Sequence, residues 1–256
     1  MRYRGLVLAA VALVGLAVGS PCFAGQAAWE PGQTWTYDFT MADVWFGENE
    51  NALTQIKDTT GKVVLQMRSR TLIDQGKLGA AGKLEFVATC TFAPDGTPLA
   101  YDFRAAVAAD SQFLHGTFAA GKFTGYYLNA AGKKEIAVDL PKGAFMVGDN
   151  NVIGHFAYFL AGKSLKVGDT LTTGLFVPQV LQSLSVSFIA EQQVDITCNG
   201  VEVTALRVKS IPLGEDFYLD KKGRLIRVEV PAQKLRIDLR PPAKTSSAKT
   251  EAAPNF

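Results

Sequence analysis

The sequence predicts a mainly β protein: a curved antiparallel meander with one short helix near residues 149–162. Apolar and polar residues alternate with period two in many segments, which is typical of strands with one buried face. Glycine-containing turns separate these segments at intervals of roughly 8–12 residues, and only one segment has helical spacing. The sheet is expected as a half-barrel, with a two-sheet sandwich as the alternative. Helix–strand alternation is missing, so a parallel α/β sheet is not expected.

Residues 1–24 have the pattern of a secretory signal peptide. A short basic start precedes an unbroken apolar run over 5–18, and small residues lead to a cleavage point after Ala24. The run is short for a membrane span, which needs about 20 residues. The rival interpretation is a lipoprotein acylated at Cys22, and Pro21 directly before that cysteine counts against it. We therefore expect a periplasmic or extracellular protein.

The composition limits the partners that the protein can have. The chain has 26 Lys+Arg and 24 Asp+Glu, and loss of the two signal-peptide arginines leaves 24 of each. Because phosphate binding requires a basic surplus, we expect no nucleic-acid partner. A hydrophobic content of 48% supports a substantial core. Peripheral membrane contact is compatible with this composition, and the oligomeric state stays open.

The first strand group is expected over residues 33–140. Its opening strand places Trp35, Tyr37, Phe39 and Met41 on one face, and the pattern returns at 83–92 and 99–107. The turns between such strands carry glycine where a positive φ is needed. They lie at 59–62, 80–83, 94–97, 119–122 and 130–133.

A second strand group is expected over residues 164–240. Its strongest signal is Asn199-Gly200 between two apolar runs, the pattern of a two-residue hairpin. Residues 25–240 are therefore expected to form one domain, in which the helix joins the two strand groups. Residues 241–256 are rich in Pro, Lys, Ser and Ala, and we expect a disordered tail there.

The helix is predicted from capping and periodicity. Residues 149–151 (Asp-Asn-Asn) can cap it, and Val152, Phe156 and Phe159 fall on one face of it. Gly162 is expected to end it as the residue after the C-cap. The helix should pack against the concave side of the sheet or plug its mouth.

Two cysteines, Cys90 and Cys198, remain after signal-peptide cleavage. In an oxidising compartment such a pair is a candidate disulfide. The alternative is two buried free thiols, because cysteine behaves as a small hydrophobic residue. Sequence spacing does not establish that the two residues are close, so both interpretations stay open.

The sequence carries none of the motifs that define common catalytic or metal sites. We expect no catalytic residue, no metal and no cofactor. His115 and His155 both lie beside aromatic residues, and we interpret them as packing residues.

Six residues are candidates for contact with an apolar ligand. Segment 43–51 is interpreted as a loop in which Trp45 and Phe46 form a binding rim. The alternative is a hairpin end whose aromatics fold back onto the core. The predicted helix adds further candidates, and the apolar stretch 175–181 adds one that could edge a cavity. These further candidates are His155, Phe156, Phe159 and Phe176.

The C-terminal part carries a family resemblance. Residues 165–170 (LKVGDT), the Asn199-Gly200 hairpin and residues 217–229 (FYLDKKGRLIRVE) follow one another in order. This arrangement resembles secreted bacterial β-rich families of unknown function, and more remotely the half-barrel lipoprotein carriers of the periplasm. The resemblance covers about 140–240. Its motifs are turn-forming, so no catalytic residue is carried over.

Three functions follow as hypotheses. The first is non-catalytic binding or carriage of an apolar ligand such as a lipid or acyl chain, which predicts a helix-lined cavity of several hundred Å³ or more. The second is an envelope interaction or scaffolding protein with a solid core and no ligand. The third and weaker one is a carbohydrate-active enzyme that uses Asp43, Glu48 or Glu50, with carboxylates about 5–9.5 Å apart across a cleft.

Overall fold

The computed structural model describes residues 29–107, 110–149 and 152–241. The predicted signal peptide over 1–24 and nearly all of the predicted tail over 241–256 lie outside these ranges.

The described residues form a single sheet of 15 strands. Its order is β8-β7-β6-β5-β4-β3-β2-β1-β15-β14-β13-β12-β11-β10-β9, and every neighbouring pair is antiparallel except the parallel pair β9–β10. The mainly β class is confirmed, and the two-sheet sandwich is wrong because hydrogen bonding is continuous across all the strands. The strands are β1 (Thr34–Met41), β2 (Val44–Lys57), β3 (Val63–Asp74), β4 (Lys83–Phe92), β5 (Pro98–Val107), β6 (Asp110–Ala119), β7 (Lys122–Asn129), β8 (Gly132–Asp139), β9 (Phe145–Val147), β10 (Thr170–Val177), β11 (Gln182–Cys198), β12 (Val201–Ile211), β13 (Asp216–Leu219), β14 (Leu225–Val230) and β15 (Leu235–Leu239).

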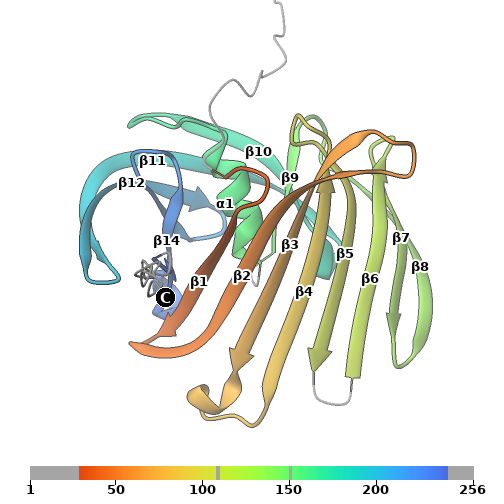
Figure 1. Ribbon diagram of the computed structural model, residues 1–256, viewed down its shortest axis with the longest axis horizontal. Coiled ribbons are helices and arrows are strands. Elements are labelled where there is room, and N and C mark those ends of the chain that lie inside the picture. The colour runs from red at the N-terminus through yellow and green to blue at the C-terminus, as the bar shows by residue number, and fades with distance from the viewer. Residues whose placement is uncertain (1–28, 108–109, 150–151, 242–256) are drawn as a thin grey trace, which may run out of the picture.

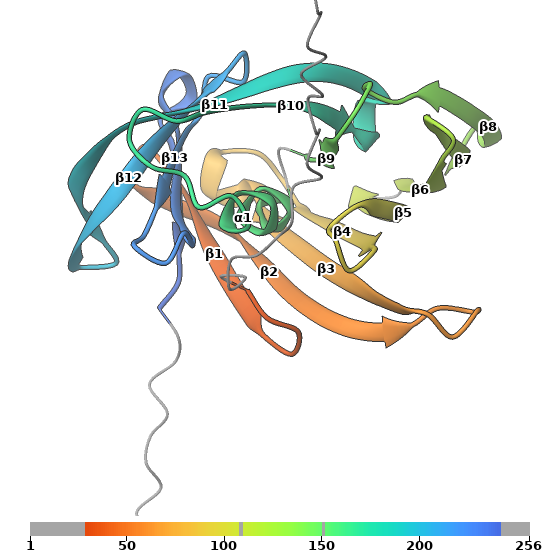
Figure 2. The same ribbon diagram turned by 90° about the horizontal axis from the view of Figure 1, so that it is seen from above.

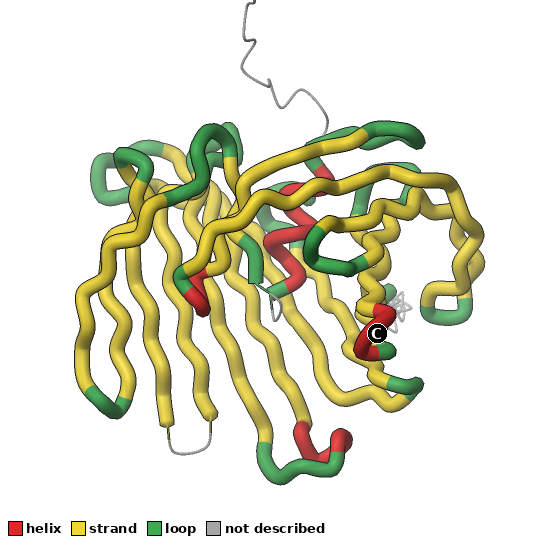
Figure 3. Tube along the Cα trace, turned by 180° about the vertical axis from the view of Figure 1, so that it is seen from behind, coloured by secondary structure: helices red, strands yellow, loops and turns green. Residues whose placement is uncertain are grey.

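The sheet curves around one α-helix, α1 (Ile153–Ala161) (Figure 1). Seen from above, α1 lies inside the curve, with β10 and β11 on one side and β1 to β3 on the other (Figure 2). The view from behind shows the turns gathered along the rims of the sheet (Figure 3). Short 3₁₀ helices occupy Gln75–Leu78 (η1), Pro178–Val180 (η2) and Pro231–Gln233 (η3). Within the described ranges, every helix is too short or too polar to cross a bilayer.

The two edges of the sheet meet through aromatic side chains at one end. Phe118 and Phe123 come from β6 and β7, and Phe145 and Phe176 come from β9 and β10. The ring centroids of Phe123 and Phe176 are 5.0 Å apart, and those of Phe118 and Phe145 are 5.7 Å apart. Such pairs contribute roughly 0.5–1.5 kcal/mol each beyond their buried area. Aromatic contacts therefore join β6 and β7 to β9 and β10 across the hollow.

Segment 43–51 was predicted as a loop, but most of it belongs to the long strand β2. Its period-two signal is lost because Asn49 and Asn51, which are polar, occupy buried inward positions. Asn49 Nδ2 donates to Thr71 Oγ1 (2.9 Å), and Ser69 Oγ donates to Asn51 Oδ1 (2.6 Å). Buried polar groups are tolerated when they are hydrogen-bonded in this way.

Helix α1 lies where the sequence predicted it, but its ends differ. The N-cap is Val152, which makes no side-chain capping bond, and Asn150 and Asn151 lie outside the described residues. Gly162 is the C-cap and has a right-handed φ of −78°, so it is not the left-handed glycine that was predicted. The left-handed residue nearby is Ser164, with φ 48°. Apolar packing inside the sheet stabilises this short helix in place of strong caps.

Candidate functional site

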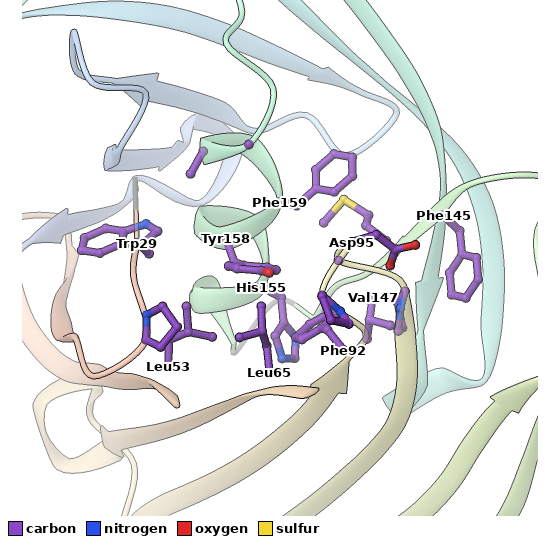
Figure 4. Close-up of a pocket in the computed structure, with 17 residues that line it drawn as sticks. Trp29, Leu53, Leu65, Phe92, Asp95, Phe145, Val147, His155, Tyr158 and Phe159 are labelled. Atoms are coloured by element: carbon purple, nitrogen blue, oxygen red, sulfur yellow. The ribbon is translucent and has the colours of Figure 1, made fainter. Parts of the chain in front are cut away.

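A cavity of about 180 Å³ lies between α1 and the concave face of the sheet (Figure 4). Its walls come from α1, from the β4–β5 turn, from β9, and from the start of the described chain. His155, Tyr158 and Phe159 reach it from the helix. The remaining lining residues are Trp29, Pro31, Leu53, Leu65, Phe92, Pro94, Asp95, Gly96, Pro98, Phe145, Met146, Val147, Ala161 and Gly162.

The cavity wall is mainly aromatic and aliphatic. Phe92 at the end of β4 packs against Tyr158 of α1, with ring centroids 5.1 Å apart. Trp29 stacks on Trp35 of β1 with a centroid separation of 4.2 Å. Contact with such a surface would be favourable for an apolar group, because it removes that group from water.

His155 is the buried polar group of the helix face, with 2% of its surface exposed. Neither ring nitrogen has a hydrogen-bond partner among the described residues. Its ring lies against Tyr101, at 5.8 Å, and Phe92, at 6.5 Å, between centroids. Burial lowers the pKa of His155 to about 3, so the imidazole is neutral at physiological pH.

One carboxylate belongs to the cavity wall, at the β4–β5 turn. Asp95 accepts a hydrogen bond from the Thr97 backbone N–H (2.9 Å). Hydrogen bonds from Thr97 lower the pKa of Asp95, which is therefore ionised at neutral pH. Asp95 is the only Asp, Glu, Lys or Arg among the lining residues that the structure describes.

A second cavity, of about 350 Å³, lies between β4–β7 and η2 and does not touch α1. Its lining is also largely apolar: Phe86, Phe103, Ala105, Gln112, Leu114, Tyr127, Pro178, Gln179, Val180 and Leu181. A third, of about 900 Å³, adjoins the C-terminal end of α1 and carries charged groups, among them Lys166, Lys221 and Arg224. Of the two larger cavities, one does not touch the helix, and the other touches it only at Leu160 and Ala161.

The structure brings together two of the six predicted ligand-binding residues, His155 and Phe159, in the cavity beneath α1. Phe156 and Phe176 are buried in the core and line none of the three cavities. Phe156 packs against Phe217 (5.4 Å between centroids), and Phe176 packs against Phe123.

Trp45 and Phe46 do not lie beside this cavity. Phe46 is buried against Phe39, with ring centroids 6.0 Å apart, as the alternative interpretation expected. Trp45 is 44% exposed, and its Nε1 donates to Asp38 Oδ1 (3.1 Å). Successive side chains of a strand point to opposite faces, so these neighbours do not form a joint rim.

The three acids considered for carbohydrate chemistry each pair with an arginine. Glu48 lies 2.6 Å from Arg240, Glu50 lies 3.5 Å from Arg70, and Asp43 lies 3.6 Å from Arg236. None of these carboxylates lines a cavity reported above. Among the described residues, no group of three or more His, Cys, Asp or Glu side chains could hold a metal ion.

Cys90 and Cys198 are both buried free thiols, so the candidate disulfide is absent between them. Cys90 faces the main core from β4, whereas Cys198 ends β11 and its Sγ lies 3.5 Å from the Ile226 carbonyl oxygen of β14. Burial raises the pKa of Cys90 well above its ordinary value and that of Cys198 to about 11. Both are therefore protonated and poorly reactive at neutral pH.

Sequence reasoning missed a histidine–carboxylate contact on the β5–β6 hairpin. His115 Nδ1 lies 2.6 Å from Asp102 Oδ1, and both side chains are partly exposed. The residues are far apart in the sequence but directly opposed in the strand register. The predicted turn at 94–97 joins β4 to β5, so it does not give the register of the β5–β6 hairpin that carries this pair.

The fold and cavity define a class: a single-sheet antiparallel β protein with an internal helix. No protein family and no curated protein matches the sequence. Two solved structures are similar in fold. A beta-barrel-like protein of domain of unknown function DUF1849 from Brucella abortus is 11% identical, with a TM-score of 0.46, and the match covers 81% of this chain and 94% of that one. A DUF1089 family protein from Pseudomonas aeruginosa is 13% identical, with a TM-score of 0.44 and coverage of 80% and 94%. Identities this low transfer no residue role.

Proposed function

We propose that this protein is an exported, non-catalytic carrier that holds an apolar ligand, such as a lipid or an acyl chain, inside the curved sheet. The observation that carries the proposal is the apolar cavity between α1 and the concave face. Its walls offer aromatic and aliphatic side chains, and its helix face presents a neutral imidazole. A site of this composition binds without a reactive group.

The volume sets how much of a ligand the cavity holds. At about 180 Å³ it is smaller than the several hundred Å³ expected from the sequence. It is comparable to an engineered cavity of about 150 Å³ that binds benzene. The cavity therefore suits one ring or the end of one chain, and the rest of a longer ligand would extend past the β4–β5 turn. Burial of about six methylene groups would contribute ~5 kcal/mol.

The proposed location is the periplasm or the cell exterior. It is supported by the basic start, the short apolar run and the small residues before Ala24. Peripheral contact with a membrane would give such a carrier access to its ligand. The remote likeness of residues 140–240 to periplasmic half-barrel carriers points in the same direction.

A second candidate is an envelope scaffolding protein without a ligand. The aromatic packing between Phe118, Phe123, Phe145 and Phe176 favours it, because these ring contacts occupy part of the hollow with the protein's own side chains. The two candidates differ in one respect that can be measured, which is whether the purified protein carries an apolar molecule.

Native mass spectrometry of protein purified from its own host, followed by solvent extraction, tests the proposal. Val147 lines the cavity beneath α1, so Val147→Phe should fill it and reduce the bound mass. Val180 lines the second cavity and is 58% exposed, so Val180→Phe is the matched control and should retain the ligand. A wild-type protein that is always empty would overturn the carrier and favour the scaffold.

A further inference from the structure

We propose that the cavity beneath α1 recognises an uncharged ligand through a hydroxyl group, as in an alcohol or a phenol, and that His155 binds this group. The inference rests on the proposed function and adds the chemical class of the ligand. It arises from His155, whose two ring nitrogens have no hydrogen-bond partner among the described residues.

Two side chains of the wall carry buried polar atoms that lack a hydrogen-bond partner among the described residues. They are His155, with both ring nitrogens, and Trp29, with Nε1. Both side chains are more than nine-tenths buried. Buried polar groups in folded proteins are almost always hydrogen-bonded, and exceptions call for an explanation. A ligand group in the cavity would supply the missing partner.

The donors and acceptors of these atoms match a hydroxyl. A neutral imidazole has one N–H donor and one acceptor nitrogen, and an indole has a donor only. A hydroxyl both donates and accepts, so it can satisfy either nitrogen of His155. A hydrocarbon would satisfy none of them, and a carbonyl could only accept.

The charge of the wall excludes an anionic ligand group. Asp95 is ionised and contributes the same sign of charge as a carboxylate or phosphate. Lys163 is the basic residue nearest to His155 in the sequence. Its ammonium lies over the Phe159 ring, 4.4 Å from the ring centroid, and Lys163 does not line the cavity. Transfer of an unpaired charge into an apolar site is strongly unfavourable. The neutral state of His155 provides no countercharge.

The probes that test this inference share one ring and differ in one substituent. Phenol carries a hydroxyl, toluene a methyl and benzoate a carboxylate, and a single ring suits a cavity of about 180 Å³. Titrations of the full chain by calorimetry or ligand-observed NMR should give phenol about a fivefold lower Kd than toluene, as one net hydrogen bond of ~1 kcal/mol implies. Benzoate should bind weakest.

Substitutions at two histidines test whether His155 is the source of the preference for phenol over toluene. His155→Leu should still bind toluene but lose the preference for phenol, whereas His115→Leu, outside the cavity, should retain it. Imidazole ¹⁵N shifts of wild-type His155 give a second measurement, independent of whether the variant folds: phenol should move them and toluene should not.

Equal affinities for phenol and toluene, or a preference that survives His155→Leu, would overturn the hydroxyl inference and leave the apolar cavity standing. An internal water on His155 would then explain its burial. If none of the three probes binds the wild-type chain, the proposed carrier function fails together with the inference.

Discussion

Gly154 of α1 lies directly against Asn51 of β2: a β-carbon at residue 154 would stand 2.0 Å from Asn51 Oδ1 and 2.9 Å from Ser69 Oγ. The missing side chain lets the helix approach the buried polar side chains of β2 and β3. The position of α1, and with it the cavity, therefore depends on this contact.

Gly154→Ala should destabilise the protein. Overpacking at a tight contact costs about 1–3 kcal/mol, which exceeds the gain of up to ~1 kcal/mol from the better helix former. Urea denaturation of the single variants, and of the double variant with Asn51→Ala, measures the coupling between the residues. Additive effects of the two substitutions would show that the helix does not depend on this contact.

Acid should destabilise the fold through His155. Its pKa in the folded protein is about 3, below the ordinary value of 6.5, so the folded state binds fewer protons in that range. Stability is full above pH 6.5 and falls as the pH drops toward 3, by on the order of 4 kcal/mol in total. Urea unfolding at pH 7 and pH 4 should show a smaller loss in His155→Phe than in wild type, and His115→Phe serves as the control.

Glu215 should have the opposite effect on the pH profile. Burial raises the pKa of Glu215 to about 7 from 4.5, so the folded state retains a proton that the unfolded chain has released. The resulting stability is full below pH 4.5 and is lost as the pH rises through 7. Glu215→Gln should remove this decline, which is on the order of 3 kcal/mol in total. A decline between pH 5 and pH 8 that persists unchanged in the variant would exclude Glu215 as its source.

Removal of one partner of the buried Arg227–Asp238 pair should be strongly destabilising. Asp238 Oδ1 accepts from Arg227 Nε at 2.6 Å, and both side chains are nearly buried. Asp238→Ala removes the acceptor of Arg227 Nε and leaves the guanidinium with the Thr197 carbonyl oxygen (2.7 Å) and Glu229 Oε1 (3.6 Å), so it should cost about 2–3 kcal/mol. The matched control is Asp139→Ala, which breaks the exposed pair with Lys122 and should leave the denaturation midpoint unchanged.

Many strands could be predicted from the sequence because one of their faces is more buried than the other, although β13 is buried on both faces. Ala88, Cys90 and Phe92 of β4 are buried, as their alternation indicated. The rule failed on β2, where Asn49 and Asn51 face inward and satisfy each other through a hydrogen bond of 2.8 Å. The alternation of apolar and polar residues cannot reveal two polar side chains that are buried and hydrogen-bonded to each other.

The candidate site was predicted only in part, for a different reason. His155 and Phe159 belong to the one helix, so their place in the hollow follows from the amphipathic pattern. Trp29 and Phe92 join them only through tertiary contacts between segments far apart in the sequence. The aromatic contacts across the hollow, such as Phe123 with Phe176, are of the same kind and also could not be predicted.

The order of the strands also determines when the sheet can be completed. β1 lies between β2 and β15, and Phe39 is paired with Ile237. The second edge of β1 therefore pairs only after β15 has been made, and the two flanking meanders remain unjoined in the sheet until residues 235–239 have been synthesised. Contacts of such sequence separation are typical of slow folding. A chain truncated before Leu235 would retain both meanders but lack the seam that joins them.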